Sequence, residues 1–180
     1  WRRTEQHKWV EGVLFTASLF IQKEILLMWI NFYDTRLEDF HTVLIKEKAI
    51  NYTTDKFFTP SSAVKLLNDV ASLNIMGEEY CYLLALNGKT QLLGIFFISK
   101  GTVNQTLLSP REIFMRALLI GASMIILCHN HPSGSSKPSR EDIIMTQKIK
   151  EAGELIGIPL ADHLVIAGDD YYSFMENGLL

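Results

Sequence analysis

Apolar and polar positions alternate along the chain in short blocks that predict strands. The uninterrupted apolar run over residues 124–128 is typical of a strand buried on both faces. Residues 80–86 are rich in strand-forming side chains, and the Asn87-Gly88 pair that follows is a strong hairpin signal, with residues 91–99 as the returning strand. Shorter apolar stretches predict further strands over residues 43–52, 103–108, 160–167 and 171–174.

The spacing of apolar residues predicts three helices between these strands. They cover roughly residues 60–76, 110–120 and 140–156. Thr59 followed by proline signals the start of the first helix, Ser109 and Glu112 form a capping box in sequence for the second, and Gly157 ends the third. Helices that alternate with strands, together with one hairpin, predict an α/β fold in which a mixed β-sheet lies between helices in three α-β-α layers.

The composition is that of a globular domain with an ordinary core. The chain has 180 residues, of which 48% are hydrophobic and 21% are charged. Its net charge of −3 gives no basic footprint, so no direct nucleic-acid binding is evident. Cys81 and Cys128 form neither a CxxC motif nor a disulfide framework, and we expect Cys128 to be a small core residue on the face opposite its neighbour His129. A reducing, cytoplasmic setting agrees with this use of cysteine.

The first 42 residues differ in character from the rest. A basic, polar start precedes the apolar run 13–21, which resembles the beginning of a signal peptide, but there is no small-residue cleavage site. Charged residues interrupt the run before it reaches the roughly 20 residues of a membrane span, so no membrane association is predicted. Met28 is a plausible native start. We therefore expect 1–42 to be an N-terminal extension outside the native fold, with 1–27 a foreign or poorly packed segment, and 43–180 to be the folded domain.

The residues that carry chemistry follow the buried apolar run. His129 and His131 fall on one face of the predicted strand, because side chains in a strand repeat every two residues. Asp142 follows in the first turn of the long helix. Two imidazoles and one carboxylate are a three-ligand set for zinc that leaves the fourth position open, as in catalytic sites. On spacing alone Asp142 is as consistent with helix capping, because Ser139 and Asp142 also have the form of a capping box.

The spacing His129-x-His131-x7-Ser139-x2-Asp142 matches the JAMM (MPN+) metalloprotease motif. Four segments resemble the RadC family of JAMM-domain proteins, namely residues 111–114, 129–134, 138–139 and 162–163. The likeness covers approximately residues 45–180. It implies a cytidine-deaminase-like fold, with a mixed sheet between helices, which agrees with the pattern of elements above.

The resemblance also implies the roles of individual residues. The two histidines and Asp142 would hold zinc, and a glutamate at the start of the first long strand after a helix would act as general base. That position is Glu79, with Glu78 as the one-residue alternative, because only one of two neighbours in a strand can face the metal. Ser139 matches the serine that supports the water or the developing oxyanion, and it can equally be a plain N-cap. For His163 we favour a structural polar pair with its neighbour Asp162 over a role behind the metal ligands.

Together these features predict a zinc-dependent hydrolase of the JAMM type in a RadC-like frame. The expected activity is that of a metallopeptidase, in which a zinc-activated water cleaves an amide or isopeptide bond of a peptide or protein substrate and Glu79 moves the proton. The alternative is a RadC-like accessory protein in DNA repair or recombination, linked to DNA repair proteins and without proteolytic activity. The helix-hairpin-helix region of RadC relatives has no recognisable counterpart in residues 1–50. A zinc-dependent nuclease is a third interpretation, whereas a deaminase would need a Pro-Cys-x-x-Cys ligand pair that the sequence lacks.

Overall fold

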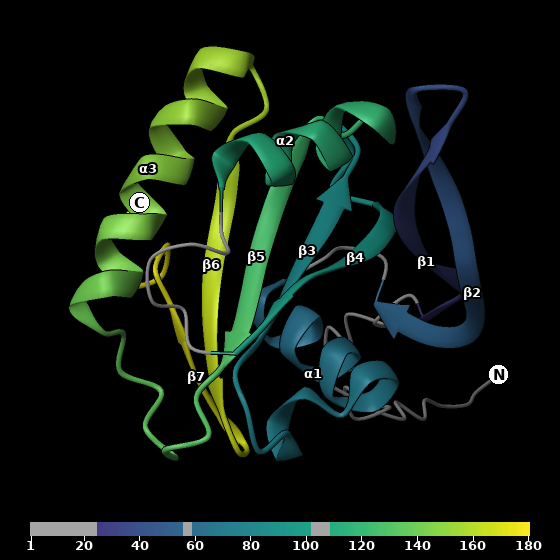
Figure 1. Cartoon of the computed structure of the whole chain (residues 1–180). Helices are drawn as coiled ribbons and strands as arrows, with labels where there is room; N and C mark the ends of the chain where they lie inside the picture. The colour runs from purple at the N-terminus through teal and green to yellow at the C-terminus, as the bar shows by residue number, and fades with distance from the viewer. Residues whose placement is uncertain (1–24, 56–58, 102–108) are drawn as a thin grey trace, which may run out of the picture.

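A seven-stranded sheet forms the centre of the computed structural model, which describes residues 25–55, 59–101 and 109–180. The strands lie in the order β2-β1-β4-β3-β5-β6-β7 (Figure 1). Their bounds are β1 Ile25–Glu38, β2 His41–Asp55, β3 Tyr80–Leu86, β4 Leu92–Lys100, β5 Met124–Asn130, β6 Leu160–Ala167 and β7 Asp170–Ser173. The helices are α1 Pro60–Ala71, α2 Pro110–Leu119 and α3 Arg140–Ile156, with a short 3-10 turn at Leu73–Ile75.

The sheet is mixed and carries helices on both faces, as the sequence predicts. Strands β1 and β4 and strands β5 and β6 pair in parallel, and the other neighbours are antiparallel. Two hydrophobic clusters flank it: one contains side chains of α1, and the other contains side chains of α2 and α3. Strand β5 supplies Ile126 and Cys128 to the first cluster and Ile125 and Leu127 to the second. The α/β fold is confirmed, and Cys128 is the buried core residue that we expected.

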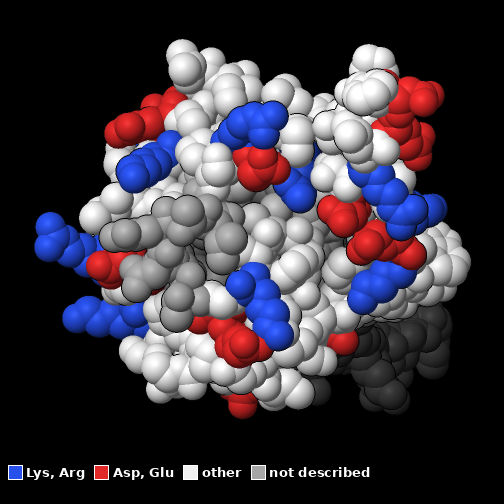
Figure 2. Space-filling model, in the orientation of Figure 1, with Lys and Arg blue, Asp and Glu red and all other residues white. Residues whose placement is uncertain are grey.

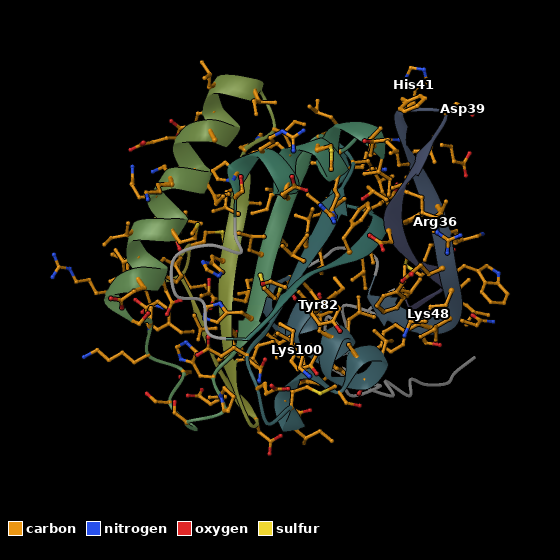
Figure 3. All side chains as sticks on the ribbon, viewed as in Figure 1. Arg36, Asp39, His41, Lys48, Tyr82 and Lys100 are labelled. Atoms are coloured by element: carbon orange, nitrogen blue, oxygen red, sulfur yellow. The ribbon has the colours of Figure 1, made fainter. Side chains whose placement is uncertain are left out.

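Residues 25–38 belong to the sheet, which corrects the expected boundary at residue 43. Strands β1 and β2 form a long hairpin whose tip, with Asp39 and His41, stands clear of the sheet (Figure 3). Asp39 and Phe40 both have positive φ, at 45° and 65°, as a two-residue hairpin turn requires. Ile30 and Phe32 of β1 are buried in the core, because they fall on the inward face of the strand. Residues 1–24, the rest of the predicted extension, lie outside the described residues.

The hairpin of β3 and β4 forms at the predicted place, but its turn is longer than two residues. Thr90, and not Gly88, takes the left-handed conformation, with φ 57°. The side-chain oxygen of Asn87 accepts hydrogen bonds from the backbone N–H groups of Lys89, at 2.9 Å, and Gln91, at 3.0 Å. Asn87 therefore acts by closing the loop with its own side chain, which is a common use of asparagine in turns.

Two helix ends differ from the prediction. Helix α1 stops at Ala71 and not near residue 76, because Ser72 turns into the left-handed region, with φ 54°. At the start of α2, Ser109 makes no side-chain capping hydrogen bond among the described residues. The Glu112 carboxylate turns to Arg116 instead, at 3.2 Å, so the predicted capping box is wrong. The strand predicted over residues 103–108 lies outside the described residues.

The surface carries charges of both signs. On the face shown in Figure 2, lysine and arginine side chains are interspersed with aspartate and glutamate, and no large patch of one sign forms there. Among the described residues, no helix combines the length and the apolar character needed to cross a membrane.

Candidate metal centre

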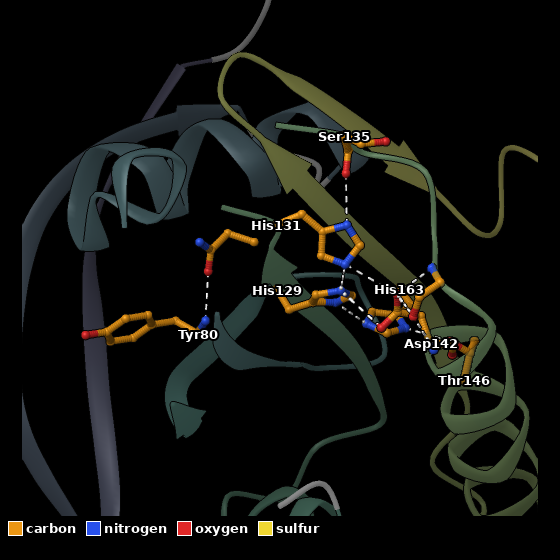
Figure 4. A network of polar contacts seen from close by, with 9 residues as sticks. Tyr80, His129, His131, Ser135, Asp142, Thr146 and His163 are labelled. Atoms are coloured by element: carbon orange, nitrogen blue, oxygen red, sulfur yellow. Dashed lines mark hydrogen bonds and ion pairs between the residues drawn. The ribbon is translucent and has the colours of Figure 1, made fainter. Parts of the chain in front are cut away.

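Strand β5 and helix α3 bring the three predicted metal ligands together. His129 is the second-to-last residue of β5, and His131 follows the end of the strand. The backbone N–H of His131 continues the pairing with β6 by donating to Ile166 O at 2.8 Å. Both rings therefore point to the face of the sheet that α2 and α3 cover. Asp142 is the third residue of α3 and is almost fully buried, at 1% exposure. The loop between strand and helix carries this carboxylate back over the two imidazoles (Figure 4).

The distances among the ligand atoms suit a tetrahedral ion. The Nε2 atoms of His129 and His131 are 3.0 Å apart, and each lies 3.3 Å from one oxygen of Asp142. Zinc bonds of about 2.0–2.1 Å in a tetrahedron place neighbouring ligand atoms about 3.3 Å apart. The observed separations therefore leave room for zinc at the centre of the three groups.

The unsatisfied acceptor atoms of the site also favour a bound cation. Asp142 Oδ1 is buried and has no hydrogen-bond partner among the described residues. His131 Nδ1 donates to the carbonyl oxygen of Ser135 at 2.9 Å, which leaves its Nε2 lone pair facing the other imidazole and the carboxylate. A buried acceptor without a donor is destabilising, and a metal ion at this point would satisfy it. The donor set of nitrogen and oxygen is one that zinc accepts.

The electrostatics of the carboxylate favour its charged form. Burial acts to raise the pKa of Asp142, but the contacts with the imidazoles of His129 and His131 outweigh it and hold that pKa well below its ordinary range. The same contact, with Asp142 as the first cause, raises the pKa of His131 above its ordinary value. A divalent cation bound at this point would interact favourably with the charged carboxylate.

Ser139 forms the N-cap of α3. Its hydroxyl accepts from the backbone N–H of Asp142 at 3.1 Å and donates to Asp142 Oδ2 at 2.6 Å. Asp142 Oδ2 also accepts from the backbone N–H of Ser139, at 2.7 Å, which completes a capping box. The two interpretations of Asp142 are thus compatible, because Oδ2 caps the helix and also lies near His131, while Oδ1 faces His129. A role of Ser139 at the substrate stays a prediction, since its hydroxyl proton is directed at the carboxylate.

The register of the sheet separates Glu79 from Glu78. Cys81 pairs with His129 across β3 and β5, and continuing this antiparallel ladder by two residues sets residue 79 opposite residue 131. Glu79 then falls on the same face as the imidazoles, and its charge is the smallest of the causes that raise the pKa of His131. Glu78 has the other orientation, and its carboxylate lies 2.6 Å from the Lys100 ammonium. Of the two glutamates, Glu79 is the one placed near the metal ligands.

The asparagine between the histidines holds the segment that carries Glu79. Asn130 is 2% exposed, and its Oδ1 accepts from the backbone N–H of Tyr80 at 2.8 Å (Figure 4). Its Nδ2 donates to the carbonyl oxygens of Met76, at 3.2 Å, and Glu78, at 3.0 Å. These three contacts bracket Glu79 on both sides. No local sequence pattern singles out Asn130, because its partners lie about fifty residues away along the chain.

The comparison with known families agrees with the motif. Residues 57–179 match the family described as the RadC-like JAB domain. The chain belongs to this family.

Two relatives of this JAB domain are named UPF0758 proteins. A UPF0758 protein of Clostridium beijerinckii is 41% identical over 133 residues, covering 74% of this chain and 57% of the relative. A UPF0758 protein of Pelobacter propionicus is 44% identical over 103 residues, which covers 57% of this chain and 45% of the relative. The chain thus spans about half the length of the curated relatives it matches.

Two further residues of the JAB domain lie at the site without having been predicted there. Cys81 is buried under His129, its cross-strand partner, and burial, with the Asp142 charge as a smaller cause, raises the pKa of its thiol to about 12. The thiol is therefore held in its protonated form in the core beside His129. Thr146 lies one helical turn after Asp142 and joins the network behind the ligands. His163, for which a structural pair with Asp162 was favoured, contacts His129 directly.

Proposed function

We propose that this JAB domain is a zinc-dependent hydrolase of the JAMM type, a metallopeptidase that cleaves an amide or isopeptide bond. The observation that carries the proposal is the arrangement of His129, His131 and Asp142 at tetrahedral separations, with Asp142 Oδ1 lacking any other partner among the described residues. Three protein ligands leave one coordination position for a reactant, whereas a structural zinc site is closed by a fourth protein ligand.

The chemistry divides between the metal and the chain. A bound zinc ion supplies Lewis acidity, which makes water acidic enough to lose a proton near neutral pH and polarises a substrate carbonyl. The Glu79 carboxylate accepts that proton and returns it to the nitrogen of the leaving group, as a general base and then a general acid. Asp142 and the two imidazoles fix the position of attack, and Ser139 holds Asp142 in place.

A cleft beside Glu79 provides space for the substrate. Its volume is about 370 Å³, which is within the usual range for small-ligand sites. It is lined by two glycines, a proline and three polar residues, namely Gly77, Gly101, Pro132, Glu78, Glu79 and Ser133. Such a lining supports binding of an extended backbone, because glycines leave main-chain groups accessible to a peptide.

Metal analysis of matched variants tests the metal part of the proposal. We expect about one zinc ion per chain in the wild type, as a three-ligand catalytic site requires. His131→Ala should lose most of the zinc, whereas His41→Ala, which removes an exposed imidazole from the tip of the β1–β2 hairpin, should retain it. Equal zinc contents in the wild type and His131→Ala would end the assignment of the ligands.

Hydrolysis of a peptide library tests the catalytic part. Glu79→Gln should retain zinc and lose cleavage, and Glu154→Gln, which changes an exposed glutamate of α3 outside the cleft, should retain both. Cleavage that persists in Glu79→Gln would remove the base from its role. Zinc binding with no peptide cleavage, together with salt-dependent DNA affinity, would favour the accessory function in DNA repair instead.

A further inference from the structure

A chain of buried hydrogen bonds runs from α3 through β6 to the first metal ligand (Figure 4). We call Thr146, His163 and His129 the imidazole chain. Nε2 of His163 lies 2.9 Å from Nδ1 of His129, and Nδ1 of His163 lies 2.6 Å from Oγ1 of Thr146. All three side chains are buried, at 1% exposure or less, so their polar atoms are shielded from solvent and bond only to neighbouring protein groups. Each proton in the imidazole chain therefore has few alternative positions.

The direction of hydrogen-bond donation along the imidazole chain follows from the hydrogen bond that the Thr146 hydroxyl makes with helix α3. The hydroxyl of Thr146 donates to the backbone carbonyl of Asp142 at 2.6 Å. A hydroxyl has one proton, so toward His163 it can only accept, and Nδ1 of His163 must carry a hydrogen. Nε2 of a neutral His163 is then an acceptor, and Nδ1 of His129 must donate to it. The Nε2 lone pair of His129 is left pointing at His131 and Asp142.

His163 is held in the state that this arrangement needs. The ring is almost fully buried, at 1% exposure, and among the described residues its two nitrogens contact only an imidazole and a hydroxyl, an environment that favours the neutral form. The ring stacks on Phe174, with centroids 5.1 Å apart and planes inclined by 16°. Stacking fixes the plane of the imidazole, and its backbone position in β6 fixes the direction of its two nitrogens.

If the hydrogen bonds of the imidazole chain were donated in the opposite direction, a hydrogen on His129 would block metal binding. If the hydroxyl of Thr146 donated to His163, each proton would move one place along, and His129 would carry its hydrogen on Nε2. That hydrogen would occupy the position where a metal needs a lone pair, and it would have to leave before metal could bind. The carbonyl of Asp142 thus influences which nitrogen of His129 is protonated, acting through the hydroxyl of Thr146 and the ring of His163.

We propose that Thr146 and His163 are positioning residues that hold His129 in the tautomer with Nδ1 protonated and thereby set the affinity of the site for zinc. The inference rests on the proposed function, because it takes zinc as the metal of this site. It assigns to His163 a role behind the ligands, where a carboxylate or a backbone carbonyl is the usual partner of a metal-binding histidine.

Zinc affinity measured by competition with a chelator tests this inference. Removing a group that orients a ligand lowers metal affinity by roughly 10-fold to 100-fold. We expect losses of that size in Thr146→Val, which keeps the shape of threonine without its hydroxyl, and in His163→Phe. Thr146→Ser restores the hydroxyl and should bind zinc within about threefold of the wild type. Ser173→Ala is the matched control, because it removes another buried hydroxyl, bonded to Asp162 at 2.6 Å, away from the metal ligands.

Nitrogen NMR of the imidazoles provides a readout that does not depend on affinity. In the metal-free wild type at pH 8 we expect His129 to be protonated on Nδ1, and in Thr146→Val we expect the proton to shift to Nε2. Thermal unfolding of each variant separates loss of fold from loss of affinity, and Thr146→Val alone suffices if His163→Phe does not fold. Wild-type affinity in Thr146→Val, or an unchanged tautomer, would overturn the imidazole chain and leave the hydrolase proposal intact. A wild type that binds no zinc would overturn both.

Discussion

Replacing Asn130 tests whether the strand that carries the histidines also positions Glu79. Asn130→Ala removes one hydrogen bond accepted from Tyr80 and two donated to the carbonyl oxygens of Met76 and Glu78. A hydrogen bond contributes about 0.5–1.5 kcal/mol net, and a buried group left without a partner costs more. Two of the three partners lie near the surface, where water can replace the amide. We therefore expect the free energy of unfolding to fall by about 2–4 kcal/mol.

Urea unfolding of the metal-free protein measures this loss, and Asn87→Ala is its control. Asn87 also makes three side-chain hydrogen bonds, to Lys89, Gln91 and the Gln91 side chain, but it does so at an exposed turn. Water replaces those bonds, so the control should lose less than about 1.5 kcal/mol. Asn130→Asp sharpens the comparison, because it keeps the acceptor for Tyr80 and sets an oxygen against two carbonyls. It should be at least as unstable as the alanine variant.

The metal and the chemistry should respond differently to Asn130→Ala. The asparagine side chain points to the opposite face of β5 from the imidazoles, so zinc affinity should stay within about threefold of the wild type, as for a residue that does not support a ligand. Peptide hydrolysis should fall, because the Glu79 segment is no longer held. A loss of stability below about 0.5 kcal/mol would refute the reasoning about the amide. Zinc lost in proportion to activity would refute the separation of the two faces.

Three further outcomes follow from the structure. Zinc at a hundred times its Kd should stabilise the wild type by about 2.7 kcal/mol and raise its Tm, and an equal rise in His131→Ala would contradict binding at this site. Gly153→Ala would place a Cβ 2.6 Å from Ile158 O, so unfolding in urea should show a loss of about 1–3 kcal/mol, while Gly77→Ala, with nothing within 4 Å, should be nearly neutral. Burial raises the pKa of Asp162 above 3.8, so the native state binds more protons than the unfolded state, and stability should fall as pH rises from about 3.8 through the folded pKa. Asp162→Asn should remove that fall, and an identical pH profile in the variant would assign it to another group.

The parts of the fold that the sequence predicted are those set by local signals. The buried run of β5, the capping box at Ser139 and the glycine that ends α3 each act within a few residues of themselves. The spacing from His129 to Asp142 is short enough that one strand and one helix position all three ligands. The mixed sheet followed from the alternation of such elements and was confirmed.

The sequence pattern does not identify strand β1, because the N-terminal region resembles the start of a signal peptide. The strand begins with an apolar block that follows a basic start, a pattern that predicts an N-terminal extension. The inward positions Ile30 and Phe32 are buried, whereas Leu27 and Trp29 are exposed at 66% and 62%. The exposed apolar side chains hid the alternation that marks a half-buried strand. The two-residue turn after it also lacks glycine and asparagine, the residues that usually signal such a hairpin.

The contacts that organise the site are the ones that no local pattern contains. His163 reaches His129 across 34 residues, and Asn130 reaches Tyr80 across 50, because β5 lies between β6 on one side and β3 on the other. Each neighbouring strand adds one function to the metal ligands: β6 brings the ring that orients His129, and β3 begins at the segment that carries Glu79. The three residues of the His-Asn-His motif therefore make different contacts on the two faces of β5. The two histidines lie on the face of the proposed metal site. The asparagine lies on the other face, by the period of the strand, and ties the segment of Glu79, the proposed general base, to the same strand.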